Sequence, residues 1–190
     1  LTIIEFNPDK LAKIKGISKK KAIDISNAFN DIKKMQNSVM FLQGYNISTN
    51  MAIKIYNTYG DKTIEYVKNN PYKLVEDIDG IGFLTADNIA KSMGIASNSM
   101  FRIRAGIIHI INENTEKTGN TFTYKKQLLD SVSTLLGLNQ EANIDKFTSA
   151  LDDMGYDKTL SIFRSKDGRE IVMLTKMYFI ESAVAQKLVL

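Results

Sequence analysis

The sequence predicts a mainly α-helical protein in which tandem helix-hairpin-helix repeats precede a winged-helix-like α+β unit. In the first half of the chain, one pattern of Gly or Asn, Ile, Ala and Ile recurs three times. In the second half, amphipathic helical patterns enclose a short strand and a hairpin centred on Asp167-Gly168, in the order helix, strand, helix, helix, strand, turn, strand. We therefore expect a repeat domain over residues 1–95 and a winged-helix-like domain over residues 96–190.

The three copies of the repeat begin at Gly16, Asn46 and Gly80 and align without gaps. They read GISKKKAIDISNAF, NISTNMAIKIYNTY and GIGFLTADNIAKSM. In each copy an alanine is small enough to let two helices approach closely, and an isoleucine one turn later fills their interface. These residues are Ala22, Ala52, Ala86, Ile25, Ile55 and Ile89.

Each copy predicts a tight turn followed by a capped helix. Glycine, and asparagine as its best substitute, allow the left-handed backbone of such a turn. Ser18 and Ser48 are expected to cap the helices that follow. An Asn-Pro pair precedes the first and third copies, and its asparagine, Asn7 or Asn70, is expected to cap an earlier helix. Apolar residues at helical spacing should bury one face of these earlier helices: Leu11, Ile14, Leu74 and Ile78.

The repeats offer an anion-binding surface rather than catalytic groups. Free amides in the turn and at the start of the second helix, together with the helix dipole, can hold one backbone phosphate regardless of base sequence. Lysines around the first turn would add a screened attraction. The candidate DNA-backbone residues are Gly16, Ile17, Ser18, Lys19, Lys20, Lys21, Gly80, Ile81, Gly82, Thr85 and Lys91. The second turn has no lysine and is interpreted as structural. Phe83 could stack on a base, but packing is the preferred interpretation.

The winged-helix-like half is not expected to enter a DNA groove. In DNA-binding proteins of that fold the third helix lies in the major groove. Here the exposed side of residues 143–155 would carry Asp145, Asp152 and Asp153, which phosphates repel. The hairpin carries three further candidates for backbone contact, Arg164, Lys166 and Arg169, although basic hairpin tips are often idle.

The single histidine, His109, is expected to lie in solvent on the side of its helix that carries Arg102. Helical spacing predicts the core of this half. The predicted core residues are Ile103, Ile107, Ile110, Ile111, Leu128, Val132, Leu135, Ile144, Phe147, Leu151 and Met154.

Composition excludes several classes of protein. The 190 residues carry a net charge of +4 and no cysteine, which rules out disulfides, cysteine-bound zinc and thiol catalysis. There is no phosphate-binding loop of the Walker type, no paired-carboxylate motif and no metal-ligand spacing, so we expect no catalytic residue, metal or cofactor here. Without a signal peptide or a membrane-length apolar run, we expect a cytoplasmic protein with no membrane partner. The first residue, Leu1, and an end within a helical pattern at Leu190 lead us to expect a piece of a longer protein.

The segment NNPYKLVEDIDGIGFLTADNIAKSMGI, from Asn69, is similar to a known family. It resembles the N-terminal region of bacterial RecD/TraA-type ATP-dependent DNA helicases, whose pattern is N-P-Y-x-L followed by D-I-x-G-I-G-F-x-x-A-D-x-I-A. The matching residues are Asn70, Pro71, Tyr72, Leu74, Asp77, Ile78, Gly80, Ile81, Gly82, Phe83, Ala86, Asp87, Ile89 and Ala90. The first copy departs from the pattern because KGISKKKA lacks the second glycine.

The resemblance implies a DNA-repair helicase that moves 5′ to 3′ on single-stranded DNA with ATP and magnesium, in a motor lying outside this chain. Such proteins are often called exodeoxyribonuclease V alpha subunits, but nothing in these residues supports nuclease chemistry. The expected partners are DNA, bound without sequence preference, and the motor domains of the same protein. The alternative from another class is a scaffold that docks on the motor or on another protein and does not touch DNA.

Overall fold

A computed structural model describes residues 2–188 and divides the chain into two compact units, Leu1–Ile81 and Gly82–Leu190. These residues are mainly helical and include one small three-stranded sheet. The division lies inside the third predicted turn, whereas the boundary predicted from the sequence, between residues 95 and 96, stays a prediction. None of the described helices is long and apolar enough to cross a lipid bilayer.

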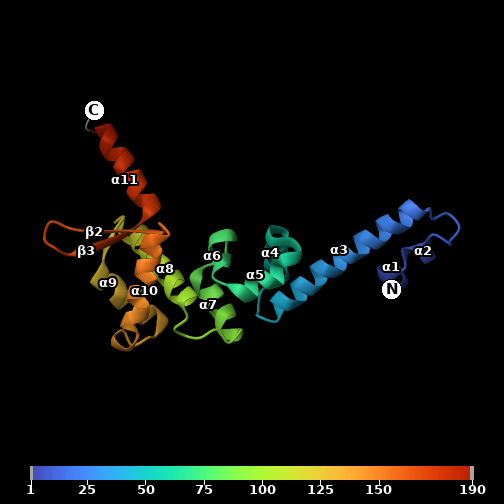
Figure 1. The fold of residues 1–190 in the computed structure, drawn as a ribbon, viewed down its shortest axis with the longest axis horizontal. Coiled ribbons are helices and arrows are strands. Elements are labelled where there is room, and N and C mark those ends of the chain that lie inside the picture. Colours follow the sequence, from blue (N-terminus) through green and yellow to red (C-terminus); the bar gives the residue numbers. More distant parts are fainter. Residues whose placement is uncertain (1, 189–190) are drawn as a thin grey trace. The chain divides into compact units, whose positions relative to one another are not determined.

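The first unit is built on one helix of 25 residues, α3 (Lys19–Gln43). Two short helices, α1 (Thr2–Phe6) and α2 (Pro8–Leu11), lie along the half of α3 that begins the helix (Figure 1). The Oγ of Ser26 on α3 donates a 2.6 Å hydrogen bond to the carbonyl of Ile4, which ties α1 to it. The remaining elements are α4 (Thr49–Tyr59), a 3₁₀ turn (Gly60–Lys62), α5 (Thr63–Asn69) and α6 (Lys73–Asp77).

The predicted interface residues of the first unit are mostly buried. Ala22, Ala52, Ile55, Leu74 and Ile78 are each at most 2% exposed, which confirms them as core residues. Leu42, Ile47, Val67, Tyr72 and Ile81 complete this core.

Several expectations for this unit were wrong. Leu11 and Ile25, which were predicted to be buried, are only half-buried. Ile14 is exposed, because α2 ends at Leu11 and Ile14 falls in the turn instead of on a helix face. Asn7 was expected to cap α2, but its side chain makes no capping hydrogen bond. The side chain of Asn70 does accept a hydrogen bond, at 3.1 Å from the amide of Tyr72, in the turn that precedes α6.

The second unit contains α7 (Phe83–Ser92), α8 (Met100–Thr118), α9 (Lys125–Leu136) and α10 (Ile144–Tyr156). A 3₁₀ turn (Glu141–Asn143) precedes α10. Strands β1 (Thr123–Tyr124), β2 (Leu160–Arg164) and β3 (Glu170–Leu174) pair antiparallel in the order β1-β3-β2. The register places Thr123 opposite Val172 and Ile162 opposite the same residue on the other side. The order of elements from α8 onward agrees with the order predicted from the sequence, and the winged-helix assignment stays an interpretation.

The helices of the second unit bury the predicted apolar faces. Buried positions that were predicted are Ile103, Ile107, Ile110, Ile111, Leu128, Val132, Phe147, Leu151 and Met154. Two predicted core positions were wrong. Ile144 is 43% exposed because it starts α10, and Leu135 is only half-buried, with Leu136 packed inward instead.

The last helix, α11 (Thr175–Leu188), leaves the end of β3, and none of its described residues is buried (Figure 1). The sequence predicts a helix from about Lys176 to Leu190, and Val189 and Leu190 lie outside the described residues.

An ion pair in the core holds three helices of this unit together. Arg102 is 3% exposed and its guanidinium donates to both carboxylate oxygens of Asp87, at 2.7 and 3.0 Å. It also donates to the carbonyls of Ser97 and Leu136, at 2.7 and 2.9 Å. The prediction that His109 lies in solvent, on the same side of the helix as Arg102, was therefore wrong. The His109 ring is half-buried and stacks on Phe83, whose preferred packing role is confirmed by its 2% exposure.

Candidate nucleic-acid interface

The first predicted turn lies in solvent and has the backbone geometry that a tight turn requires. Gly16 has a φ of +93°, in the region that favours glycine, and no atom beyond its own chain neighbours lies within 4 Å of where a Cβ would be. Ser18 has an extended backbone, and its Oγ accepts a 3.2 Å hydrogen bond from the amide of Lys21, so its predicted capping role is confirmed.

Free donors remain at the start of α3. Within residues 2–188 the amides of Ser18, Lys19 and Lys20 have no hydrogen-bond acceptor. The side chains of Lys19, Lys20 and Lys21 are all exposed, and the first turn of α3 contains no acidic residue. Cations at a helix N-terminus oppose the helix dipole, so a bound anion would relieve both this repulsion and the unsatisfied amides.

Two of the predicted contact residues cannot offer their amides. The N–H of Ile17 donates to the carbonyl of Ile14 at 3.0 Å, and the N–H of Ile81 donates to that of Ile78 at 3.1 Å. The side chain of Ile81 is also buried. Any contact with a phosphate therefore falls to the amides that follow these isoleucines.

The third turn has a basic neighbour that linear sequence does not indicate. Gly80 has a φ of +95°, and the terminal methyl of Met51 lies 3.4 Å from its virtual Cβ. The Nζ of Lys54 donates a 2.6 Å hydrogen bond to the carbonyl of Asp79, directly before this glycine. Lys54 lies on α4, so only the tertiary packing of the first unit brings its charge to the turn.

The third predicted copy continues in the second unit, where α7 begins after Gly82. Gly82 is exposed and supplies no side-chain cap, and the amide of Leu84 has no acceptor within residues 2–188. Thr85 is exposed on the first turn of α7. Lys91 is in the last turn, about 12 Å along the axis from Phe83, and pairs with Asp87 at 2.9 Å. Lys91 is therefore not brought to the start of α7.

The second turn shares the geometry but not the charge. Asn46 has a φ of +61°, as its substitution for glycine predicts, and Ser48 caps α4 by accepting from the amide of Met51 at 3.4 Å. This turn lies at the end of α3, whose 25 residues separate it from the first turn by about 37 Å. The two turns therefore cannot bind adjacent phosphates.

The three wing residues differ in how far they are engaged. Arg169 donates to Asp167 at 2.6 Å and to the hydroxyl of Tyr124 at 2.8 Å. Hydrogen bonds from Arg169 and then from Ser165 hold the pKa of Asp167 well below its ordinary value. Arg164 and Lys166 are exposed and make no ion pair within the described part of the chain.

Comparison with known proteins finds a family that resembles the middle of this chain. Residues 31–122 match the family described as the ATP-dependent RecD2 DNA helicase HHH domain, where HHH stands for helix-hairpin-helix. Residues 31–122 are therefore similar to a RecD2-type helix-hairpin-helix domain. A curated ATP-dependent RecD2 DNA helicase from Deinococcus radiodurans is 22% identical over 120 residues. These residues are 63% of this chain and 17% of that relative, so the chain spans a small part of the relative's length.

The matched segment includes the second turn and the Gly80 turn, together with Lys54, Asp87 and Arg102. The family resemblance drawn from the Asn70–Ala90 pattern is thereby confirmed. The first turn, with its lysine cluster, lies before residue 31 and outside the matched segment. Its assignment therefore depends on the geometry of Gly16 and Ser18 alone.

Proposed function

We propose that this chain is a non-catalytic DNA-binding accessory region of an ATP-dependent helicase, and that it grips the DNA backbone without reading base sequence. The observation that carries the proposal is the start of α3, where Ser18, Lys19 and Lys20 offer unpaired amides beside three exposed lysines. A positive helix end with free amides is suited to one phosphate.

Recurrence of this geometry supports tandem hairpins. Gly16, Asn46 and Gly80 occupy equivalent positions of the repeat and all have positive φ angles, of +93°, +61° and +95°. The lysines make the first turn the strongest phosphate site, and Lys54 adds charge at the third. The relative's printed name, ATP-dependent RecD2 DNA helicase, supports DNA as the ligand. ATP and magnesium would then act in a 5′–3′ motor outside these residues.

Salt dependence of DNA binding tests the proposal. Fluorescence anisotropy with a labelled duplex and a labelled single strand should give dissociation constants of about 10⁻⁴ to 10⁻⁶ M. Log affinity should fall with log salt at a slope of about −2 to −3, as expected for two or three phosphate contacts. Replacing Lys19, Lys20 and Lys21 together by alanine should flatten that slope by about 1 or more.

A matched control removes the same charge elsewhere. Lys62, Lys73 and Lys187 are exposed and make no ion pair within residues 2–188, so their triple alanine variant keeps net charge equal to that of the test variant. We expect the control to retain the parental slope. Equal effects of the two triple variants, or no binding at low salt, would refute the grip at the first turn.

The exposed face of α11 favours a second candidate function, docking on another part of the helicase. Phe179, Ile180, Val184 and Leu188 are between 50% and 81% exposed, which is unusual for one short helix of a folded unit. A scaffold role would predict that a Phe179→Ser, Ile180→Ser variant loses association with the motor domains while its DNA binding is unchanged. Pull-down of separately expressed motor domains distinguishes the two functions.

A further inference from the structure

A cavity of about 250 Å³ in the second unit has the chemistry of a site for one planar, hydrogen-bonding group. It lies between the end of α8, β1 and the first turns of α9, and it is lined by Asn114, Thr118, Asn120, Phe122, Thr123, Tyr124 and Gln127. Its volume is below the roughly 300–1,000 Å³ of pockets that take drug-sized ligands. It is therefore suited to one ring system rather than to a large cofactor.

An exposed aromatic ring forms one wall of the cavity. Phe122 is 41% exposed, and its ring meets that of Tyr124 nearly perpendicularly, at 86° and 5.8 Å between centroids. In an edge-to-face pair, at least one face of each ring is left uncovered by the other ring. Phe122 therefore has an uncovered ring face on which a flat group entering the cavity can stack.

The other walls carry side-chain amides with free hydrogen-bonding capacity. Asn114, Asn120 and Gln127 make no side-chain hydrogen bond within the described residues 2–188. Each amide offers donors and an acceptor, as the edge of a nucleobase does. No acidic side chain lines this cavity, so nothing in its wall repels a phosphate.

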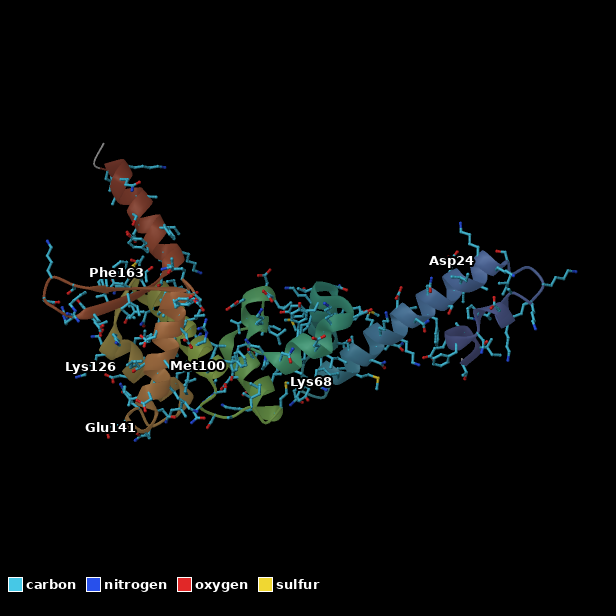
Figure 2. All side chains as sticks on the ribbon, in the orientation of Figure 1. Asp24, Lys68, Met100, Lys126, Glu141 and Phe163 are labelled. Atoms are coloured by element: carbon cyan, nitrogen blue, oxygen red, sulfur yellow. The ribbon has the colours of Figure 1, made fainter. Side chains whose placement is uncertain are left out.

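A second cavity, of about 420 Å³, adjoins the first through Tyr124 and supplies positive charge. The Arg169 guanidinium carbon lies 3.8 Å from the centroid of the Tyr124 ring, which positions this cation at the cavity wall. Lys126 on α9 is exposed and makes no ion pair within the described chain (Figure 2). The acidic residue lining this cavity, Glu170, is paired with Lys125 at 3.0 Å.

We propose that the Phe122 cavity binds one unstacked base of single-stranded DNA, while Lys126 and Arg169 attract the adjoining backbone. Stacking on an aromatic ring beside a basic surface is the usual way that proteins hold single strands without sequence preference. A base inside a duplex is stacked and paired, so it cannot enter this cavity without leaving the duplex. The inference rests on the proposed function in taking DNA as the ligand, but it uses none of the hairpin residues.

The chain contains no tryptophan, so Phe122→Trp introduces a single fluorescent reporter at the proposed stacking position. We expect oligothymidylate to quench this fluorescence, and an abasic strand with the same number of phosphates to leave it unchanged. Equal quenching by the abasic strand, or by a blunt duplex, would mean that phosphates alone are recognised and would overturn the proposal. Quenching by thymidine monophosphate at the same concentration as the oligonucleotide would instead assign a free-nucleotide site and would also overturn it.

Affinity measurements provide a second, independent readout. Phe122→Leu keeps an apolar side chain but removes the stacking face, and it should weaken oligothymidylate binding by about fivefold or more. Phe179→Leu changes another exposed phenylalanine of the same unit and should have no effect. Circular dichroism verifies that both variants fold. Unchanged single-strand affinity in Phe122→Leu, or an equal loss in Phe179→Leu, contradicts the proposal.

The two proposals fail in different ways. Phe122→Leu should leave duplex binding and its salt slope unchanged, whereas the alanine triple variant at Lys19, Lys20 and Lys21 should alter both. If only the triple variant has an effect, the base site is refuted and the backbone grip stands. If only Phe122→Leu has an effect, and only on single strands, the base site stands and the backbone grip at the first turn is refuted.

Discussion

The guanidinium of Arg102 and the carboxylate of Asp87 form a bidentate pair, with hydrogen bonds of 2.7 and 3.0 Å and side chains that are 3% and 5% exposed. The same guanidinium also holds two carbonyls, so a single side chain connects α7 and the end of α9 to α8. Asp87 belongs to the helicase-like sequence pattern, and its observed contacts give it a structural role.

Removal of either partner should strongly destabilise the protein. Asp87→Ala removes the counter-ion of a buried guanidinium, and Arg102→Ala leaves the buried carboxylate with its surface contact to Lys91. Loss of a buried partner of this kind typically costs about 3–5 kcal/mol of unfolding free energy. The apolar double variant Asp87→Leu, Arg102→Met should cost less than either single change. Urea unfolding measures all three. Lys91→Ala is the control, because it removes only a surface contact to Asp87 and should change stability by about 1 kcal/mol or less.

Backbone geometry at the third turn predicts a contrast between two neighbouring glycines. Gly80 has a φ of +95°, so Gly80→Ala places a Cβ in the left-handed region and should lower the unfolding free energy by about 1–2 kcal/mol. Gly82 has a φ of −91° and open space where a Cβ would lie, so Gly82→Ala should be tolerated. Equal losses in the two variants, measured by denaturant unfolding, would contradict this explanation.

At the second turn the same reasoning predicts a neutral or stabilising change. Asn46 has a φ of +61°, which glycine adopts without steric cost, so Asn46→Gly should be at least as stable as the parent protein. Asn46→Ala should lose about 1 kcal/mol. Asn57→Ala, at an exposed helical position of α4, controls for the loss of an amide side chain. A large loss of stability in Asn46→Gly would show that the asparagine side chain itself is required.

Acid stability should depend on Asp61. Hydrogen bonds from Lys34 and then from Tyr56 lower the pKa of this carboxyl below its ordinary value. Because the folded-state pKa is depressed, the stabilisation is present above the unfolded value and is lost as pH falls through the folded value. The difference in urea midpoint between the parent protein and Asp61→Asn should therefore be larger at neutral pH than at pH 3. Asp24→Asn, on exposed surface of α3 (Figure 2), controls for the loss of one carboxylate, and a difference independent of pH would contradict the assignment.

Local features of the fold could be predicted from the sequence, and the exceptions have physical causes. Ser18 and Ser48 cap helices through hydrogen bonds to residues three positions away. The left-handed turn at Asn46 depends on the φ preference of that residue itself. The prediction that Ile14 is buried failed because α2 ends at Leu11, and the length of a short helix depends on its tertiary packing more than on periodicity. The exposed acidic side of α10 was correct, because the periodic pattern there extends over a full helix.

The residues of the candidate site show the same contrast between local features and features that depend on tertiary packing. The sequence by itself determined where the tight turns and the capped helix starts would form, because φ preferences and caps act over one turn of chain. Tertiary structure alone decided that Arg102 is a core residue, that Lys54 reaches Asp79, and that Phe122 lines a cavity with unpaired amides. Each of these relationships joins segments that are separated in the sequence, and only the packing of the folded chain brings those segments within contact distance.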